Sequence, residues 1–180
     1  TTNGPPAGFT GAPFEATCTA CHVGAPVNSG PTTFTISAPA LLTPGGRNPV
    51  GVGFGISPAS KWGFQVTARD GAGNPSGSWQ VVEVGKTKTA AGGGFHHEHT
   101  AAGTQQRFWT MSWIAPPSLP HGPVTFHAAG NETNANLAPT GDFIYSASTK
   151  AFQASLTTAS PGWPIGSTQS VTLTAPNHGG

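Results

Sequence analysis

Short runs in which every second residue is apolar follow one another through this chain, separated by turns rich in glycine and proline. Clear examples extend from Val50 to Ile56 and from Trp62 to Ala68. Such alternation is typical of half-buried strands, because successive side chains of a strand point to opposite faces. No segment shows a convincing long helical period. This pattern therefore predicts an all-β fold that is built as an antiparallel β-sandwich.

The chain divides into three parts of one domain. Residues 1–31 are rich in Gly, Pro, Ala and Thr, and we expect an ordered loop there. Residues 32–156 carry the alternating runs and should form the sandwich. Residues 157–180 begin with a Pro- and Gly-rich connection and end in a last apolar run, so they are interpreted as a C-terminal tail or an extra strand.

Composition narrows the class of protein. In 180 residues there are 26 Gly and 18 Pro, only 7% of residues are charged, and the formal net charge is +1. The 36% of hydrophobic residues, with five Trp and ten Phe, can still form a packed core. Near-neutral charge argues against nucleic-acid binding, which needs a clustered basic surface. No stretch approaches the length of an apolar membrane span.

The two cysteines of the chain lie in one motif, Cys18-Thr19-Ala20-Cys21-His22. The C-x-x-C-H spacing is that of a c-type haem attachment site, in which both thiols join porphyrin vinyl groups and the histidine binds iron. We therefore predict one covalent haem c, tethered by Cys18 and Cys21, with His22 as the proximal iron ligand. A disulfide would close a very small loop, and a zinc site would need two further ligands.

Covalent haem attachment takes place outside the bacterial cytoplasm. The N-terminus has no charged region followed by an apolar one, so we expect the mature form of an exported precursor. The predicted location is periplasmic or extracellular, and redox proteins are the expected partners.

Several segments together resemble bacterial reeler-like domains that carry a haem-type motif, related to choice-of-anchor surface modules. The matching pieces, spread over residues 10–148, are Thr10-Gly11-Ala12-Pro13 before the cysteine motif, Gly63-Phe64-Gln65-Val66-Thr67-Ala68, Glu98-His99-Thr100, residues 109–116, Ala128-Ala129-Gly130-Asn131 and Gly141-Asp142-Phe143-Ile144-Tyr145. The resemblance implies an exported, immunoglobulin-like β-sandwich with an N-terminal haem-binding loop. Met111 and His127 depart from the family pattern, and both are residues that could bind iron.

The sixth iron ligand is the main open question of the sequence. His99 is the first choice, because it lies in the Glu-His-Thr piece that the resemblance covers. His97 and His96 follow, with alternation placing His97 and His99 on one face of a strand. Met111 and His127 are further alternatives. Met111 alternates in phase with two tryptophans, which favours a core position.

Other residues have simpler interpretations. Arg47, Lys61 and Arg107 are candidates to pair with haem propionates, and Phe9, Phe14 and Phe95 could pack on a porphyrin. His121, in a Pro-His-Gly turn, and His178, near the end of the chain, are interpreted as solvated loop residues.

The sequence favours an electron carrier, a monohaem c-type cytochrome with two histidine ligands, over an enzyme. Two alternatives stay open. A five-coordinate haem would make the protein a sensor or a peroxidase-like protein, with His97, His99 or His127 as a distal acid or base. A homo-oligomer or filament subunit is the structural alternative, since exposed strand edges pair with other chains.

Overall fold

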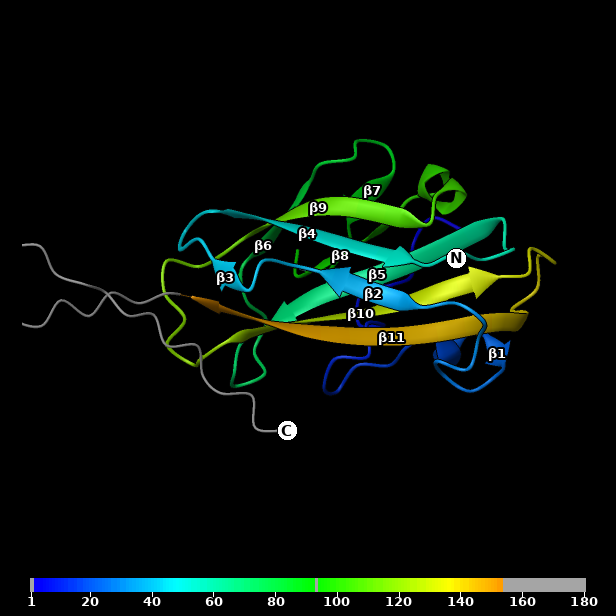
Figure 1. Ribbon diagram of the computed structural model, residues 1–180, viewed down its shortest axis with the longest axis horizontal. Coiled ribbons are helices and arrows are strands. Elements are labelled where there is room, and N and C mark those ends of the chain that lie inside the picture. The colour runs from blue at the N-terminus through cyan, green and yellow to red at the C-terminus, as the bar shows by residue number, and fades with distance from the viewer. Residues whose placement is uncertain (1, 93, 154–180) are drawn as a thin grey trace, which may run out of the picture.

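In the computed structural model, which describes residues 2–92 and 94–153, two sheets face each other across one core (Figure 1). No α-helix occurs in these two ranges. The only helical segments there are two short 3₁₀ helices, η1 (Cys18–Ala20) and η2 (Ala102–Gln105). The expected antiparallel β-sandwich is confirmed.

The larger sheet has seven strands. Along its main path they follow the order β1 (Val23–Gly24), β11 (Thr140–Gln153), β10 (Val124–Thr133), β5 (Lys61–Arg69), β8 (His96–His99) and β7 (Thr87–Thr89), and β3 (Leu41–Leu42) also pairs with β11. The central pairs β11–β10, β10–β5 and β5–β8 are antiparallel. The short strands β1 and β3 pair with β11 in parallel, near its two ends.

The smaller sheet has four strands, β2 (Phe34–Ser37), β4 (Arg47–Phe54), β9 (Phe108–Ile114) and β6 (Ser78–Val81), in that spatial order. All its pairs are antiparallel. Its strands correspond to alternating runs of the sequence, although β6 ends at Val81 and residues 82–84 leave the sheet.

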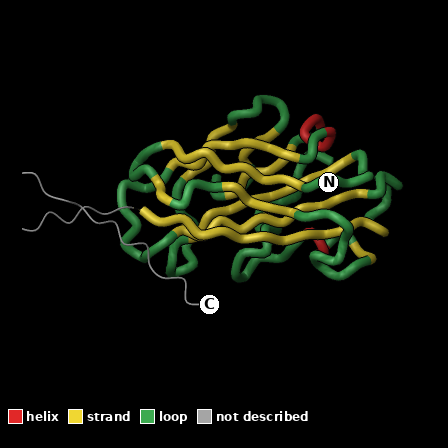
Figure 2. The backbone as a smooth tube through the Cα atoms, viewed as in Figure 1, coloured by secondary structure: helices red, strands yellow, loops and turns green. Residues whose placement is uncertain are grey.

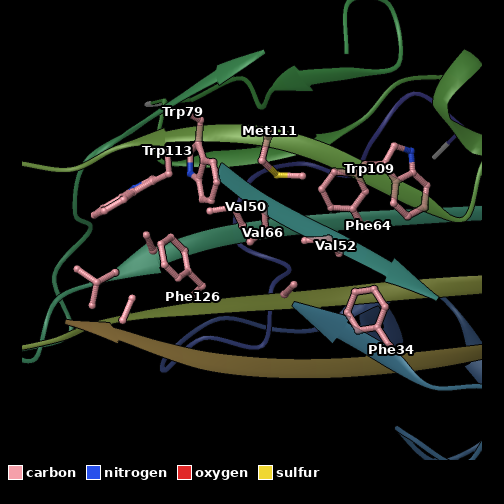
Figure 3. Packing of buried hydrophobic residues seen from close by; sticks show 14 of the residues in the cluster. Phe34, Val50, Val52, Phe64, Val66, Trp79, Trp109, Met111, Trp113 and Phe126 are labelled. Atoms are coloured by element: carbon pink, nitrogen blue, oxygen red, sulfur yellow. The ribbon is translucent and has the colours of Figure 1, made fainter. Parts of the chain in front are cut away.

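The core forms where the apolar faces of the two sheets meet (Figure 3). Val50, Met111 and Trp113 of the smaller sheet and Val66 and Phe126 of the larger one are each fully buried. The alternation in the sequence therefore correctly identifies the residues that face the core.

The N-terminal segment covers the outer face of the larger sheet. Gln65 alternates with the core residues Phe64 and Val66, so it points outward, yet its exposed fraction is 0%. Its amide accepts hydrogen bonds from the backbone N–H groups of Gly8 and Phe9, at 3.1 and 2.8 Å, and donates to the carbonyl of Pro6 at 2.9 Å. The first residues of the chain are thus held against the sheet.

The two 3₁₀ helices lie at the same end of the sandwich, opposite the end that carries β3 (Figures 1 and 2). This end combines the cysteine motif with the first residues of β5 and the last residues of β8. A pocket that contains residues of both segments lies at this end of the sandwich.

Candidate haem pocket

A pocket of about 390 Å³ brings together the attachment motif and the preferred sixth ligand. Cys18, Cys21, His22 and His99 all line it. The volume lies within the range of small-molecule and cofactor sites. Much of the remaining wall is apolar, formed by Pro5, Pro6, Phe9, Trp62, Phe64, Ala135, Leu137, Ala138 and Pro139.

Local hydrogen bonds shape the cysteine motif. The hydroxyl of Thr17 accepts a hydrogen bond from Thr19 N–H at 3.3 Å and caps η1. The carbonyl of Cys18 accepts from the backbone N–H groups of Cys21 and His22, at 3.2 and 2.9 Å. Both cysteines are free thiols. The turn thus folds without a disulfide, and both cysteines line one pocket.

The two thiols differ in environment. Cys21 is exposed, whereas burial raises the pKa of the Cys18 thiol to about 12. A buried apolar surrounding disfavours the thiolate. Cys18 therefore lies on the inner side of the motif and Cys21 on the outer side.

The His22 ring is held by Asp142. Its Nδ1 lies 2.6 Å from Asp142 Oδ2, and the Asp142 residue is 2% exposed. The pairing of β1 with β11 explains the contact, because Val23 pairs with Thr140 and Gly24 with Asp142. An imidazole bound at Nδ1 by a carboxylate offers Nε2 to a metal, the usual arrangement around metal-binding histidines.

His99 is the last residue of β8, directly after the residues of that strand that pair with β5. Its Nδ1 is 2.9 Å from the backbone nitrogen of Phe64 and 3.0 Å from the Phe64 carbonyl oxygen. The ring also lies against Gly63, where an added Cβ would come within 2.6 Å of His99 Cε1. Gly63 is therefore required for the present position of the His99 ring.

The pairing of β10 with β5 positions the imidazoles of His22 and His99 near each other. Asn131 Nδ2 lies 3.2 Å from His22 Nδ1, and Asn131 pairs directly with Gly63 across β10 and β5. His22 thus packs on one member of a cross-strand pair and His99 on the other. Adjacent strands are separated by about 4.8 Å.

His22 and His99 are side chains of the kind that would hold a haem iron on its two faces. Among residues 2–92 and 94–153, no group of three or more His, Cys, Asp or Glu side chains is placed to hold a metal ion. A porphyrin provides four nitrogens itself and needs only axial ligands. Two polar atoms of pocket residues, Trp62 Nε1 and Asn131 Oδ1, are also buried without a hydrogen-bond partner in the described structure. Such atoms are expected where a polar ligand belongs.

Comparison with solved structures supports the fold. The Reelin-N domain of F-spondin matches with a TM-score of 0.54 and 18% sequence identity, over 77% of this chain and 96% of that one. The fold is reeler-like. A scan against protein-family models and a search of curated proteins find no match. At this identity the comparison concerns the fold alone, which agrees with the resemblance expected from the sequence.

The alternative ligands lie elsewhere in the reeler-like sandwich. Met111 is fully buried in the core, between Val50 and Val81 of the flanking strands. His97 is also fully buried, with its ring centroid 5.8 Å from that of Trp79. Neither residue lines the pocket that holds the cysteine motif.

His96 and His127 belong to the outer face of the larger sheet. His96 Nε2 lies 2.9 Å from Glu15 Oε1. Burial and, second, the charge of Arg69 lower the pKa of His127, which is half-buried on β10. The neighbouring side chains of His96 and His97 lie on opposite faces of the sheet, as alternation along a strand requires. His121 is exposed in its turn, and His178 lies outside the described residues.

Of the residues expected to contact the haem propionates or the porphyrin, only some line the pocket. Lys61 and Phe9 line the pocket. Arg47 pairs with Ile114 in the smaller sheet, and Arg107 donates to the Gly55 carbonyl at 3.3 Å. Phe14 and Phe95 are exposed and do not line the pocket.

Sequence reasoning missed three residues that shape the pocket: Gly63, Asn131 and Asp142. Each lies within a segment of the family resemblance, which was the one available signal. Their roles depend on cross-strand pairing and on β1, a strand of two residues that no periodicity reveals.

The described part of the chain contains no helix with the length and hydropathy of a membrane span.

Proposed function

We propose that this chain is a monohaem c-type cytochrome that transfers single electrons outside the cytoplasm. The observation that carries the proposal is the pocket that Cys18, Cys21, His22 and His99 share, although His99 lies far from the other three residues in the sequence. A covalently bound haem supplies an iron that gains and loses one electron. The redox partner is expected to be another protein.

The residues of the chain have separable tasks in this proposal. Cys18, the first residue of η1, and Cys21, the residue that follows η1, tether the group. His22 binds through Nε2, because its Nδ1 is engaged by Asp142. The apolar wall, including Phe9 and Phe64, limits water around the ligands, and burial of this kind helps to set the potential of a haem.

His99 completes the proposed ligand set. If its Nδ1–H donates to the Phe64 carbonyl, Nε2 carries the lone pair that binds iron. Two histidine ligands leave no open coordination position, so electron transfer requires no substrate binding at iron.

One observation favours a second function, a five-coordinate haem sensor or peroxidase-like protein. Phe64 N–H also points to His99 Nδ1 at 2.9 Å, and acceptance of that hydrogen bond would place the proton on Nε2. His99 would then be a distal hydrogen-bond donor instead of a ligand.

The first experiment is expression with a c-type haem maturation system, followed by mass spectrometry and optical and EPR spectra of the oxidised protein. The proposal expects one covalent haem, lost when Cys18 and Cys21 are both changed to Ala, and a low-spin signal unaffected by cyanide or carbon monoxide. A high-spin signal that shifts with these ligands supports the second function. No attached haem overturns both.

The second experiment tests His99 itself. His99→Ala should convert the spectrum to high-spin, and His99→Met should restore a low-spin spectrum with a higher potential, since Met/His ligation raises it. His121→Ala, a change of the same kind at an exposed turn, is the control and should have no effect. A His99→Ala protein that stays six-coordinate and low-spin excludes His99 as the ligand.

A further inference from the structure

Asp142 is a buried carboxylate with few partners. Oδ2 contacts His22 Nδ1 at 2.6 Å and accepts from Asn131 Nδ2 at 3.4 Å, and Oδ1 accepts from the backbone N–H of Asn134 at 3.0 Å. Among the ion pairs of the described residues, its only partner is His22. The residue is 2% exposed, so water screens its charge weakly.

We propose that Asp142 is a positioning residue that fixes the His22 ring as the Nδ1–H tautomer and makes it an electron-rich iron ligand, so that the oxidised state of the bound iron is favoured. This inference rests on the proposed haem function. A carboxylate accepts the Nδ1 proton, which leaves the Nε2 lone pair for the metal and raises the basicity of the ligand.

The charge of Asp142 makes it more than a fixed hydrogen-bond acceptor. A neutral acceptor, such as a backbone carbonyl, orients an imidazole but draws its proton less strongly. In a chain with only six acidic residues, one is buried at this contact. The more strongly the proton is held by Asp142, the more negative charge remains on the ring. A more anionic ring stabilises Fe(III) relative to Fe(II), which lowers the reduction potential.

The structure also shows how to separate this role from folding. Asp142→Asn keeps the shape and an oxygen that can accept from Asn134 N–H. Its amide then faces His22 with an N–H donor, which favours the Nε2–H tautomer. In a serine-protease triad, the same substitution preserves geometry and leaves the wrong tautomer. Asp142→Glu keeps a carboxylate and is the conservative rescue.

The first test is a redox titration of the haem-loaded protein. Loss of a partner of this kind typically changes metal affinity by 10- to 100-fold. If the ferric state loses tenfold more affinity than the ferrous state, the potential of Asp142→Asn rises by about 59 mV. Asp142→Glu should remain closer to the wild type. Asp70→Asn, which removes the same charge from an exposed turn, should leave the potential unchanged. Equal potentials for wild type and Asp142→Asn overturn the inference.

The second test needs no haem. In the reduced, haem-free chain, long-range ¹⁵N–¹H NMR correlations report which nitrogen of His22 carries the proton. The wild type should show Nδ1–H, and Asp142→Asn should shift the population toward Nε2–H. A wild-type ring protonated at Nε2 alone overturns the inference, even if the variant does not fold. Failure of haem attachment overturns the proposed function instead, so the two failures are distinguishable.

Discussion

His97 lies against Trp79, with ring centroids 5.8 Å apart and ring planes inclined by 34°. The imidazole has an exposed fraction of 0%, and neither of its nitrogens has a hydrogen-bond partner within the described ranges. A charged ring is strongly disfavoured in such a place. Burial accordingly lowers the pKa of His97 from its usual 6.5 to about 4.

This histidine should make the protein sensitive to acid. The unfolded chain takes up a proton below about pH 6.5 and the folded chain only near pH 4, so stability is complete above pH 6.5 and falls as the pH decreases toward 4. The loss from this residue should reach about 3 kcal/mol. Urea unfolding at pH 7.5, 5.5 and 4 measures it.

The matched variants isolate the effect of His97. His97→Phe should lose less stability between pH 7.5 and 4 than the wild type does, because its ring cannot take a proton. His121→Gln, at an exposed turn, should keep the wild-type dependence. An unchanged pH dependence in His97→Phe would show that another group is responsible.

The two cysteines of the haem-free protein should differ in reactivity. Because burial raises the pKa of the Cys18 thiol to about 12, only a very small fraction of it is ionised at pH 8. Exposed Cys21 should be alkylated by iodoacetamide at least tenfold faster. Peptide mass spectrometry after timed quenching measures both rates. In guanidinium the two rates should converge, and equal rates in the folded protein contradict a protected, half-buried Cys18.

Gly63→Ala should displace the His99 ring. The new Cβ would lie 2.6 Å from His99 Cε1, too close for any contact, and the side chain or the strand must move. We expect a loss of about 1–3 kcal/mol of stability and, in the haem-loaded protein, a larger high-spin fraction.

Gly51→Ala is the control for Gly63→Ala. It places a Cβ against the half-exposed ring of Phe108 on the smaller sheet, away from the pocket. Both variants add a methyl group to a strand glycine, and only Gly63→Ala should change the spectrum. If both leave it unchanged, the close packing of Gly63 and His99 has no bearing on iron ligation.

Glu15→Gln should loosen the N-terminal segment. Burial by itself would raise the pKa of Glu15, but hydrogen bonds with His96, Thr10 and Arg69 and the nearby His96 charge outweigh it and lower that pKa to about 2. The folded carboxylate therefore stays ionised down to about pH 2, whereas the unfolded chain takes up a proton below about pH 4.5. Its contribution to stability is complete above about pH 4.5 and is lost progressively as the pH falls from 4.5 to 2. In the variant, amides of residues 8–17 should exchange hydrogen several-fold faster at pH 7. Unchanged exchange there contradicts a holding role for Glu15.

The sequence predicted the two-layered fold correctly, but it did not predict the length of every strand. The runs around Val50 and Phe64 became β4 and β5, because one face of each meets the core. The strand β11 is much longer than these short runs, because it includes both Phe143 and Phe152 and pairs with nearly all of β10. The expected run at residues 170–175 lies outside the described residues.

The pocket was predictable only in part. The cysteine motif and His99 were found from local pattern and resemblance, and the structure places them together; ligation itself stays a prediction. Asp142 could not be found this way, because its contact with His22 spans 120 residues. Gln65 and Glu98 likewise look solvent-facing by alternation, and only the N-terminal segment over the sheet explains their burial.

The parallel pairing of β1 with β11 also orders events during synthesis. The cysteine motif leaves the ribosome early, and the residues that pair beside it, Thr140 and Asp142, leave it more than a hundred residues later. Contacts that span such a distance form late in folding. The cysteine motif therefore stays open on one side until β11 is in place, and the pairing of β1 with β11 brings Asp142 to the wall of the pocket.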